Sequence, residues 1–375
     1  MQVNLDKTKI MVFRNGGPVK QSEKWFFGKD KLEIVTYYKY LGLMISSRLN
    51  WSFATKTLSA QSEKAVTGIK CVIIKCGGMS MDNSFELFDK MVVPILIYGS
   101  EVWGYQQYST IERVHYRFCK YLLNVSSNTH NSAVLGECGR QPIFIKCYVK
   151  VISYWIKLLH MNVNRLPKCV YTTMLNLDAS GKQNWVTHVK DILFRYGFGY
   201  AFIWQEIGNS ELFIREFKQR LQDSYMQEWS ETIHSSSKLK TYCTFKTLLQ
   251  PEKYLDIIKI KKYRVALTRF RCSNHNLCIE TGRREKVLLN DRRCLYCIKE
   301  GKSYVEDEYH FISICNLYNN IRTKYIKYAY KCSLFEFCNL LKCTNLTTVC
   351  ELGVYIYNAF SIREQFLNDN NNVNT

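Results

Sequence analysis

The sequence lacks the features that would place it in a membrane or in a secreted disulfide-rich class. No run of 18 or more apolar residues occurs, because the richest stretch, residues 91–98, is interrupted by Pro94, and this excludes a spanning helix. Asp6, Lys7 and Lys9 stand where a signal peptide would have its apolar core, so we expect no export signal and no membrane partner. Only five prolines occur in 375 residues, and little therefore interrupts long helices.

The chain also lacks the common catalytic motifs. A polymerase or nuclease that uses two metal ions needs closely placed carboxylates, and the sequence contains no Asp-Asp pair. It has no glycine-rich phosphate loop and no Gly-x-Ser-x-Gly elbow. None of its seven histidines lies in a recognisable catalytic context. We therefore expect no catalytic residue and no small-molecule substrate for this chain alone.

What the sequence does have is apolar content, positive charge and cysteine. With 47% hydrophobic residues, a chain of this length is expected to bury a core in two or three packing units. Lys and Arg number 52 against 32 Asp and Glu, a net charge of +20, which favours a polyanionic partner. Sixteen cysteines without an export signal indicate reduced thiols in the nucleus or cytoplasm, some of them metal ligands.

Hydrophobic periodicity predicts a mainly α fold with a small N-terminal β-sheet, an α+β arrangement. Short apolar segments separated by glycine-containing turns indicate strands at residues 9–13, 24–27, 32–35 and 39–45, which would form two hairpins. From Ser52 onward helical spacing dominates, with Gly77-Gly78 as a stop. Amphipathic helices are expected at residues 85–98, 110–123, 144–161, 185–196, 211–233, 252–269 and 345–366.

Composition and periodicity predict four regions along the chain. Residues 1–50 form the β-rich segment and residues 51–236 a helical region. The serine run 235–237 is the best candidate for a linker, so a basic helical region with a metal module is expected at residues 237–366. The asparagine-rich tail, residues 367–375, is expected to be disordered.

The most specific local signal is a set of metal-ligand residue types at the spacing Cys-x2-Cys-x12-His-x4-Cys, formed by Cys294, Cys297, His310 and Cys315. Two thiolates separated by two residues can hold one Zn²⁺ from a tight turn, and a His and a Cys about one helical turn apart complete a tetrahedron. Since all four positions carry donor atoms, no position is open for a catalytic water, and a structural zinc is expected. Residues 306–308, all acidic, would orient the imidazole or cap its helix. Buried thiols with one core histidine are the alternative.

The positive charge is concentrated around this motif. Residues 240–302 contain 16 Lys or Arg against 6 Asp or Glu, which predicts a surface that pairs with phosphates. Aromatic residues between the charges would stack on bases, although an ordinary solvated helix face is the alternative. The expected nucleic-acid contacts are Lys259, Lys261, Lys262, Arg264, Arg269, Arg271, Arg283, Arg284, Arg292 and Arg293.

Several segments together resemble the carboxy-terminal part of a non-LTR (LINE-like) retrotransposon reverse transcriptase. Residues 4–13 (NLDKTKIMVF) are similar to the segment that closes the palm, and residues 38–45 (YKYLGLMI) to the hairpin that follows it. Residues 93–104 (VPILIYGSEVWG) are similar to a helix end in the thumb. Residues 275–283 (HNLCIETGR), with the four metal-ligand positions, resemble the family's terminal Cys-Cys-His-Cys module.

The resemblance implies a palm remnant, a helical thumb-like region and a zinc module that binds RNA or DNA. It also implies that the catalytic aspartates, and the Mg²⁺ they bind, would lie upstream of Met1, so this chain would be a catalytically incomplete remnant. Two alternatives stay open: a fragment of an active RNA-directed DNA polymerase, and a helical protein-interaction protein whose metal only stabilises a binding surface.

Overall fold

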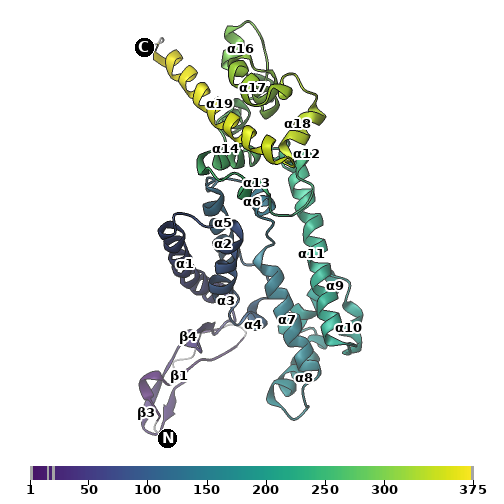
Figure 1. Cartoon of the computed structure of the whole chain (residues 1–375). Coiled ribbons are helices and arrows are strands. Elements are labelled where there is room, and N and C mark those ends of the chain that lie inside the picture. Colours follow the sequence, from purple (N-terminus) through teal and green to yellow (C-terminus); the bar gives the residue numbers. More distant parts are fainter. Residues whose placement is uncertain (1–2, 15–16, 19–21, 373–375) are drawn as a thin grey trace. The chain divides into compact units, whose positions relative to one another are not determined.

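The computed structural model describes residues 3–14, 17–18 and 22–372, which form a mainly α protein with a small β part near the N-terminus (Figure 1). This confirms the predicted fold class. The chain divides into two compact units, here called unit 1 (Met1–His115 with Pro142–Gln222) and unit 2 (Tyr116–Gln141 with Asp223–Thr375). The chain passes between the units three times: inside α5 (Ser109–Leu123), between Gln141 and Pro142, and inside α11 (Ser210–Ser235). The predicted linker at residues 235–237 begins where α11 ends.

The β part of unit 1 consists of two small sheets. The first has the strand order β1-β3-β2, with β1 (Lys9–Ile10) parallel to β3 (Asp30–Ile34), and β2 (Trp25–Phe27) antiparallel to β3. The second is a hairpin of β4 (Tyr37–Tyr40) and β5 (Leu43–Ser46). Its two-residue loop places Leu41 and Gly42 at φ values of 46° and 86°, the left-handed conformation that a tight hairpin turn requires. The predicted pairing of four strands into two hairpins is therefore only partly right. The β2–β3 hairpin joins two of the expected strands, whereas β1 pairs with β3 in parallel. The β4–β5 hairpin covers residues 39–45, where a single strand was expected from the apolar pattern, because the chain turns at Leu41 and Gly42.

The helices of unit 1 surround a core of large apolar side chains. Helix α7 supplies Val151, Ile152 and Trp155, all fully buried. It contacts α4, α8 and α9, while α1 contacts α3 and β5. The remaining elements of the unit are η1 (Leu5–Lys7), α1 (Ser52–Lys75), α2 (Met81–Leu87), η2 (Phe88–Val92), α3 (Val93–Leu96), α4 (Ser100–Trp103), α7 (Ile143–Leu159), α8 (Leu166–Ala179), α9 (Trp185–Arg195) and α10 (Gly199–Trp204).

Unit 2 is built around α19 (Leu346–Asn372), which contacts α14 (Lys261–Arg271), α13 (Tyr254–Ile257) and α17 (Asn319–Tyr325). Aromatic rings fill its core, with the Phe311 ring centroid 4.7 Å from those of Tyr318 and Phe360. The other elements are α6 (Asn131–Cys138), α12 (Tyr242–Phe245), α15 (Cys278–Arg284), η3 (Leu289–Asp291), α16 (Leu295–Lys299), η4 (His310–Ile314), η5 (Asn316–Tyr318), η6 (Lys327–Ala329) and α18 (Leu334–Leu341).

Three further expectations for the elements differ from the structure. The helix expected at residues 252–269 is two helices, α13 and α14, because Ile258 and Ile260 adopt extended ψ angles of 97° and 109°. The helix expected at residues 85–98 is divided among α2, the π-helical turn η2 and α3. The tail expected to be disordered is helical as far as Asn372, and residues 373–375 lie outside the described residues.

In the part of the chain that the structure describes, no helix combines the length and the apolar character needed to cross a bilayer.

Candidate metal centre

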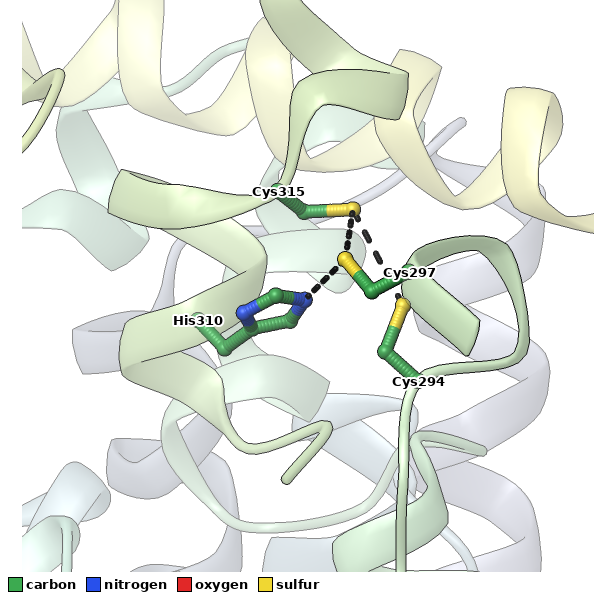
Figure 2. A group of neighbouring side chains, drawn as sticks. All are labelled: Cys294, Cys297, His310 and Cys315. Atoms are coloured by element: carbon green, nitrogen blue, oxygen red, sulfur yellow. Dashed lines mark hydrogen bonds between the residues drawn. The ribbon is translucent and has the colours of Figure 1, made fainter. Parts of the chain in front are cut away.

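The four residues of the Cys-x2-Cys-x12-His-x4-Cys pattern converge in unit 2 (Figure 2). One potential ligand atom from each of Cys294, Cys297, His310 and Cys315 lies within 4.8 Å of every other, and all four residues are buried. No other group of three or more His, Cys, Asp or Glu side chains in the described residues has this arrangement. The spacing in the sequence therefore predicted a real cluster.

The first two ligands come from a tight turn at the start of α16. Cys294 is the residue before the helix, and its carbonyl accepts from the Ile298 N–H at 3.0 Å. The Cys297 carbonyl accepts from the Lys302 N–H at 2.8 Å, which closes the other side of the turn. A short antiparallel bridge beside it brings the Tyr304 carbonyl within 2.9 Å of the Cys294 N–H. Backbone hydrogen bonds thus hold both thiols on one side of the turn.

The second pair of ligands lies at the two ends of the π-helical turn η4. The Cys315 N–H donates to the His310 carbonyl at 2.9 Å, five residues back, so the wider turn places both side chains on one face. Asp307 begins this turn, since its carboxylate accepts from the His310 N–H at 2.7 Å. The capping role expected of the acidic residues therefore belongs to Asp307. The Nδ1 atom of His310 is buried and has no hydrogen-bond partner among the described residues, so none of the three acidic side chains orients the ring.

The interatomic distances fit a tetrahedral ion. With Zn–S bonds of about 2.3 Å and a Zn–N bond of about 2.05 Å, a regular tetrahedron separates two sulfurs by about 3.8 Å and a sulfur from a nitrogen by about 3.6 Å. The Sγ atom of Cys315 lies 3.9 Å from those of Cys294 and Cys297. The Nε2 atom of His310 lies 3.5 Å from Cys297 Sγ. These separations are far too long for a disulfide, whose S–S bond is about 2.05 Å, and they match four ligands around one ion.

The thiols also influence one another's protonation. Hydrogen bonds from Cys315 and His310 lower the pKa of Cys294 to about 4, although burial opposes the shift. Burial and the neighbouring Cys294 raise the pKa of Cys297 to about 11. The hydrogen bond to Cys294 and burial raise the pKa of Cys315 as well. The protein alone therefore stabilises one thiolate in the cluster, and a divalent cation is the group that would balance three.

Buried ion pairs fasten the segment that carries the ligands to the rest of unit 2. Glu306 accepts from Arg363 of α19 at 2.7 and 2.6 Å. Glu308 lies 3.1 Å from His275 Nε2. The fully buried Arg322 donates to the Cys315 carbonyl at 2.7 Å. The sequence pattern did not identify Arg322 or Arg363 as supports for the site, because no local spacing links them to it.

The exposed members of the predicted nucleic-acid contacts carry most of the accessible charge. Their side chains are exposed on the segment between α13 and α14, on α14, on α15 and on the bridge before α16, and they are Lys259, Lys261, Lys262, Arg269, Arg284 and Arg293. Lys262 Nζ lies 5.0 and 4.9 Å from the ring centroids of Tyr263 and Tyr357, so its charge is partly directed at those rings.

Three other predicted contacts are half-buried and hydrogen-bonded to the chain itself. Arg264 donates to the Ile258 carbonyl at 3.1 Å, and Arg283 pairs with Glu280. The Arg292 guanidinium donates to the carbonyls of Val287, at 3.0 and 2.9 Å, and of Ile279, at 3.1 Å. These three arginines stabilise the module from within. Their charge is less available to a ligand than that of the six exposed residues.

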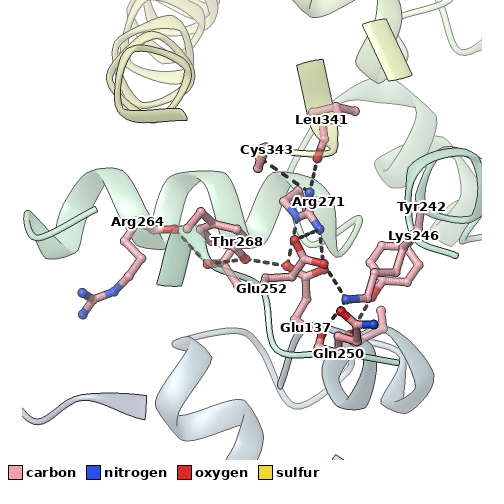
Figure 3. Close-up of polar contacts among 12 residues, drawn as sticks. Glu137, Tyr242, Lys246, Gln250, Glu252, Arg264, Thr268, Arg271, Leu341 and Cys343 are labelled. Atoms are coloured by element: carbon pink, nitrogen blue, oxygen red, sulfur yellow. Dashed lines mark hydrogen bonds and ion pairs between the residues drawn. The ribbon is translucent and has the colours of Figure 1, made fainter. Parts of the chain in front are cut away.

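Arg271 lies in the interior, 2% exposed (Figure 3). Its guanidinium pairs with both carboxylate oxygens of Glu137 at 2.9 Å and with Glu252 at 2.8 Å. Tyr254 donates a further hydrogen bond to Glu137 at 2.6 Å. The prediction that Arg271 contacts nucleic acid is therefore wrong. Arg271 is a core residue, because it is buried and paired with two carboxylates where no phosphate can reach it. The sequence did not reveal this, since Glu137 is 134 residues away.

Comparison with known proteins adds no assignment: no family model, no curated protein and no solved structure matches the chain. The reverse-transcriptase resemblance stays a prediction.

Proposed function

We propose that the chain binds RNA or DNA through a basic, zinc-stabilised module, in keeping with its resemblance to the carboxy-terminal part of a LINE-like reverse transcriptase. The observation that carries the proposal is the convergence of three thiols and one imidazole within 4.8 Å, next to exposed lysines and arginines. The proposed function is binding, without a catalytic group. The module's task is to position a nucleic-acid strand.

The ion is zinc in a structural role. Three sulfurs and one nitrogen suit zinc among the common cellular metals, and a closed four-ligand set leaves no position for a reacting water. The free energy of metal binding stabilises the fold of the segment, because the ligands come together only when the segment is folded. One equivalent of zinc per chain after purification without chelators is expected, and less than about half an equivalent would contradict the assignment.

The nucleic-acid role is tested by the salt dependence of binding. Each phosphate contact contributes about 0.9 to the slope of log affinity against log salt for a duplex, and about 0.7 for a single strand. A variant with Lys261→Ala, Arg284→Ala and Arg293→Ala removes three exposed cations. We expect its slope in filter-binding titrations to be shallower by about 2 for single-stranded RNA or about 2.7 for duplex DNA.

The matched control removes three exposed cations from unit 1, by Lys182→Ala, Lys218→Ala and Arg220→Ala. Its net charge equals that of the test variant, so a general charge effect would shift both slopes equally. Native protein with no salt-dependent affinity for either nucleic acid would defeat the proposal.

A second candidate, a protein-binding surface, is favoured by apolar side chains near the metal ligands. Leu288 is 75% exposed, Leu295 49% and Ile298 48%, although isolated exposed apolar residues are ordinary. Under this alternative the three cation replacements would leave partner binding unchanged, and Leu288→Ser would weaken it.

A further inference from the structure

We propose that unit 1 contains a recognition pocket for an unpaired guanine base. The pocket is a cavity of about 270 Å³ between the loop that follows α4, helix α7 and helix α9. The side chains that line it include Tyr105, Gln107, Tyr148, His188, Asp191 and Arg195. The inference goes beyond the proposed function, because the pocket belongs to a different compact unit from the metal centre and does not depend on the ion.

Helix α9 presents three of these groups along one face. His188, Asp191 and Arg195 are spaced by three and then four residues, which aligns them on the same side of an α-helix. The helix start is fixed by Asn184, whose side chain accepts from the Val186 N–H at 2.8 Å. The Thr187 hydroxyl in turn accepts from the Asn184 N–H at 3.0 Å. His188, Asp191 and Arg195 are therefore positioned by a capped, regular helix rather than by a loop.

An aromatic pair forms one wall of the cavity. The rings of Tyr105 and His188 stack with centroids 4.0 Å apart and an interplanar angle of 7°. Trp51 fixes the Tyr105 hydroxyl by donating to it from Nε1 at 3.2 Å. Burial lowers the pKa of His188, although Asp191 opposes the shift, so the imidazole is neutral near pH 7. Each ring has one face covered by the other, so we expect a base to stack on the uncharged outer face of the pair.

The two charged groups select the ligand. A phosphate or other simple anion would be attracted by Arg195 but repelled by the carboxylate of Asp191 in the same cavity. A ligand that donates to the carboxylate and accepts from the guanidinium satisfies both. Among the bases, guanine alone presents two adjacent donors, N1–H and the N2 amino group, beside the O6 acceptor. Adenine offers one donor on that edge, and its ring nitrogen would face Asp191 unfavourably.

The volume and the other polar groups agree with this choice. A cavity of about 270 Å³ lies below the range of about 300–1,000 Å³ for drug-sized ligands, so it suits one ring system. Gln107 and Tyr148 also line the cavity, and although they are hydrogen-bonded to each other, their remaining polar capacity can serve the sugar or the far edge of the base. Single-stranded nucleic acid is read in this way, by stacking a splayed base and bonding its Watson–Crick edge.

The test compares two single-stranded RNA heptamers, UUUGUUU and UUUAUUU, by fluorescence anisotropy with the full chain. We expect the guanine heptamer to bind about tenfold tighter or more, which is the discrimination of one good bidentate contact. Asp191→Asn changes an exposed side chain and should abolish that preference because a carboxamide has only one acceptor oxygen. Glu211→Gln, which removes an exposed carboxylate outside the pocket, should retain it.

Competition with guanosine monophosphate decides the source of the base. Displacement of the guanine heptamer by the mononucleotide supports a pocket for free guanine nucleotides, and binding of the heptamer without displacement supports a base within a strand. Equal affinity of the native chain for the two heptamers would overturn the proposal. An unchanged preference in Asp191→Asn, with an unchanged circular dichroism spectrum, would overturn it as well. Neither result bears on the salt-dependent binding expected of the zinc module.

Discussion

Replacing Cys315 by alanine removes one of the four converging ligands and leaves the turn around it intact. The Cys315 N–H bonds to the His310 carbonyl, and its own carbonyl accepts from Arg322, so the backbone contacts do not depend on the thiol. Structural zinc contributes about 10–16 kcal/mol in zinc-finger peptides. Shared among four ligands, this is about 2.5–4 kcal/mol each, or roughly 70- to 900-fold in zinc affinity.

Cys332→Ala is the matched control for this change. Cys332 is another buried thiol of unit 2, 7% exposed, and its Sγ atom contacts the Ser313 hydroxyl at 3.2 Å rather than the cluster. Both variants lose one buried sulfur, so both should lose a similar amount of packing free energy. Zinc content by mass spectrometry and a competition titration with a chromophoric chelator should separate them, with only Cys315→Ala losing zinc. Equal zinc affinity in the two variants would refute the assignment of Cys315 as a ligand.

Three further predictions concern the stability of unit 2. Glu137→Gln leaves Arg271 with a weakened buried partner and should reduce the free energy of local opening by about 3–5 kcal/mol, measured by hydrogen exchange in α6 and α14. Arg271 holds the pKa of Glu137 below its usual value against the effect of burial. This stabilisation is complete above the ordinary glutamate pKa of about 4.3 and is lost as pH falls below it. An acid titration followed by circular dichroism should therefore show cooperative loss of helix below about pH 4, and a flat profile down to pH 2 would contradict it. Gly139→Ala should lower the free energy of unfolding by more than the roughly 1–3 kcal/mol that is usual for an overpacked residue. Gly139 has a φ of 61°, and an added Cβ would clash with the Pro251 nitrogen. An unchanged urea unfolding curve would contradict this.

Local patterns in the sequence predicted the elements whose cause is local. The helix expected at residues 110–123 is observed as Ser109–Leu123, and the one expected at 185–196 as Trp185–Arg195. The metal ligands were also predictable, because a tight turn and a single helical turn bring each pair together within a few residues. These spacings follow from backbone geometry alone.

Features that depend on partners distant in the sequence could not be predicted from local patterns. Arg271 lies two residues from the exposed Arg269 in the same basic helix, and its buried partners Glu137 and Glu252 distinguish its role. The break between α13 and α14 has no proline or glycine to mark it. The pocket lined by Tyr105 and His188 joins residues more than 80 positions apart. Periodicity reports which face of an element is buried, and it does not report what that face meets.

The π-helical turn at His310–Ile314 has one residue more than an α-helical turn would use between the same two points. Shortening the interval from His310 to Cys315 by one residue would still leave both side chains on one face, at the i, i+4 spacing of an ordinary helix. The spacing of this module therefore differs by one residue from that of a module in which three residues separate the His and the Cys. We expect a variant of this chain that is one residue shorter in this interval to build the same coordination sphere.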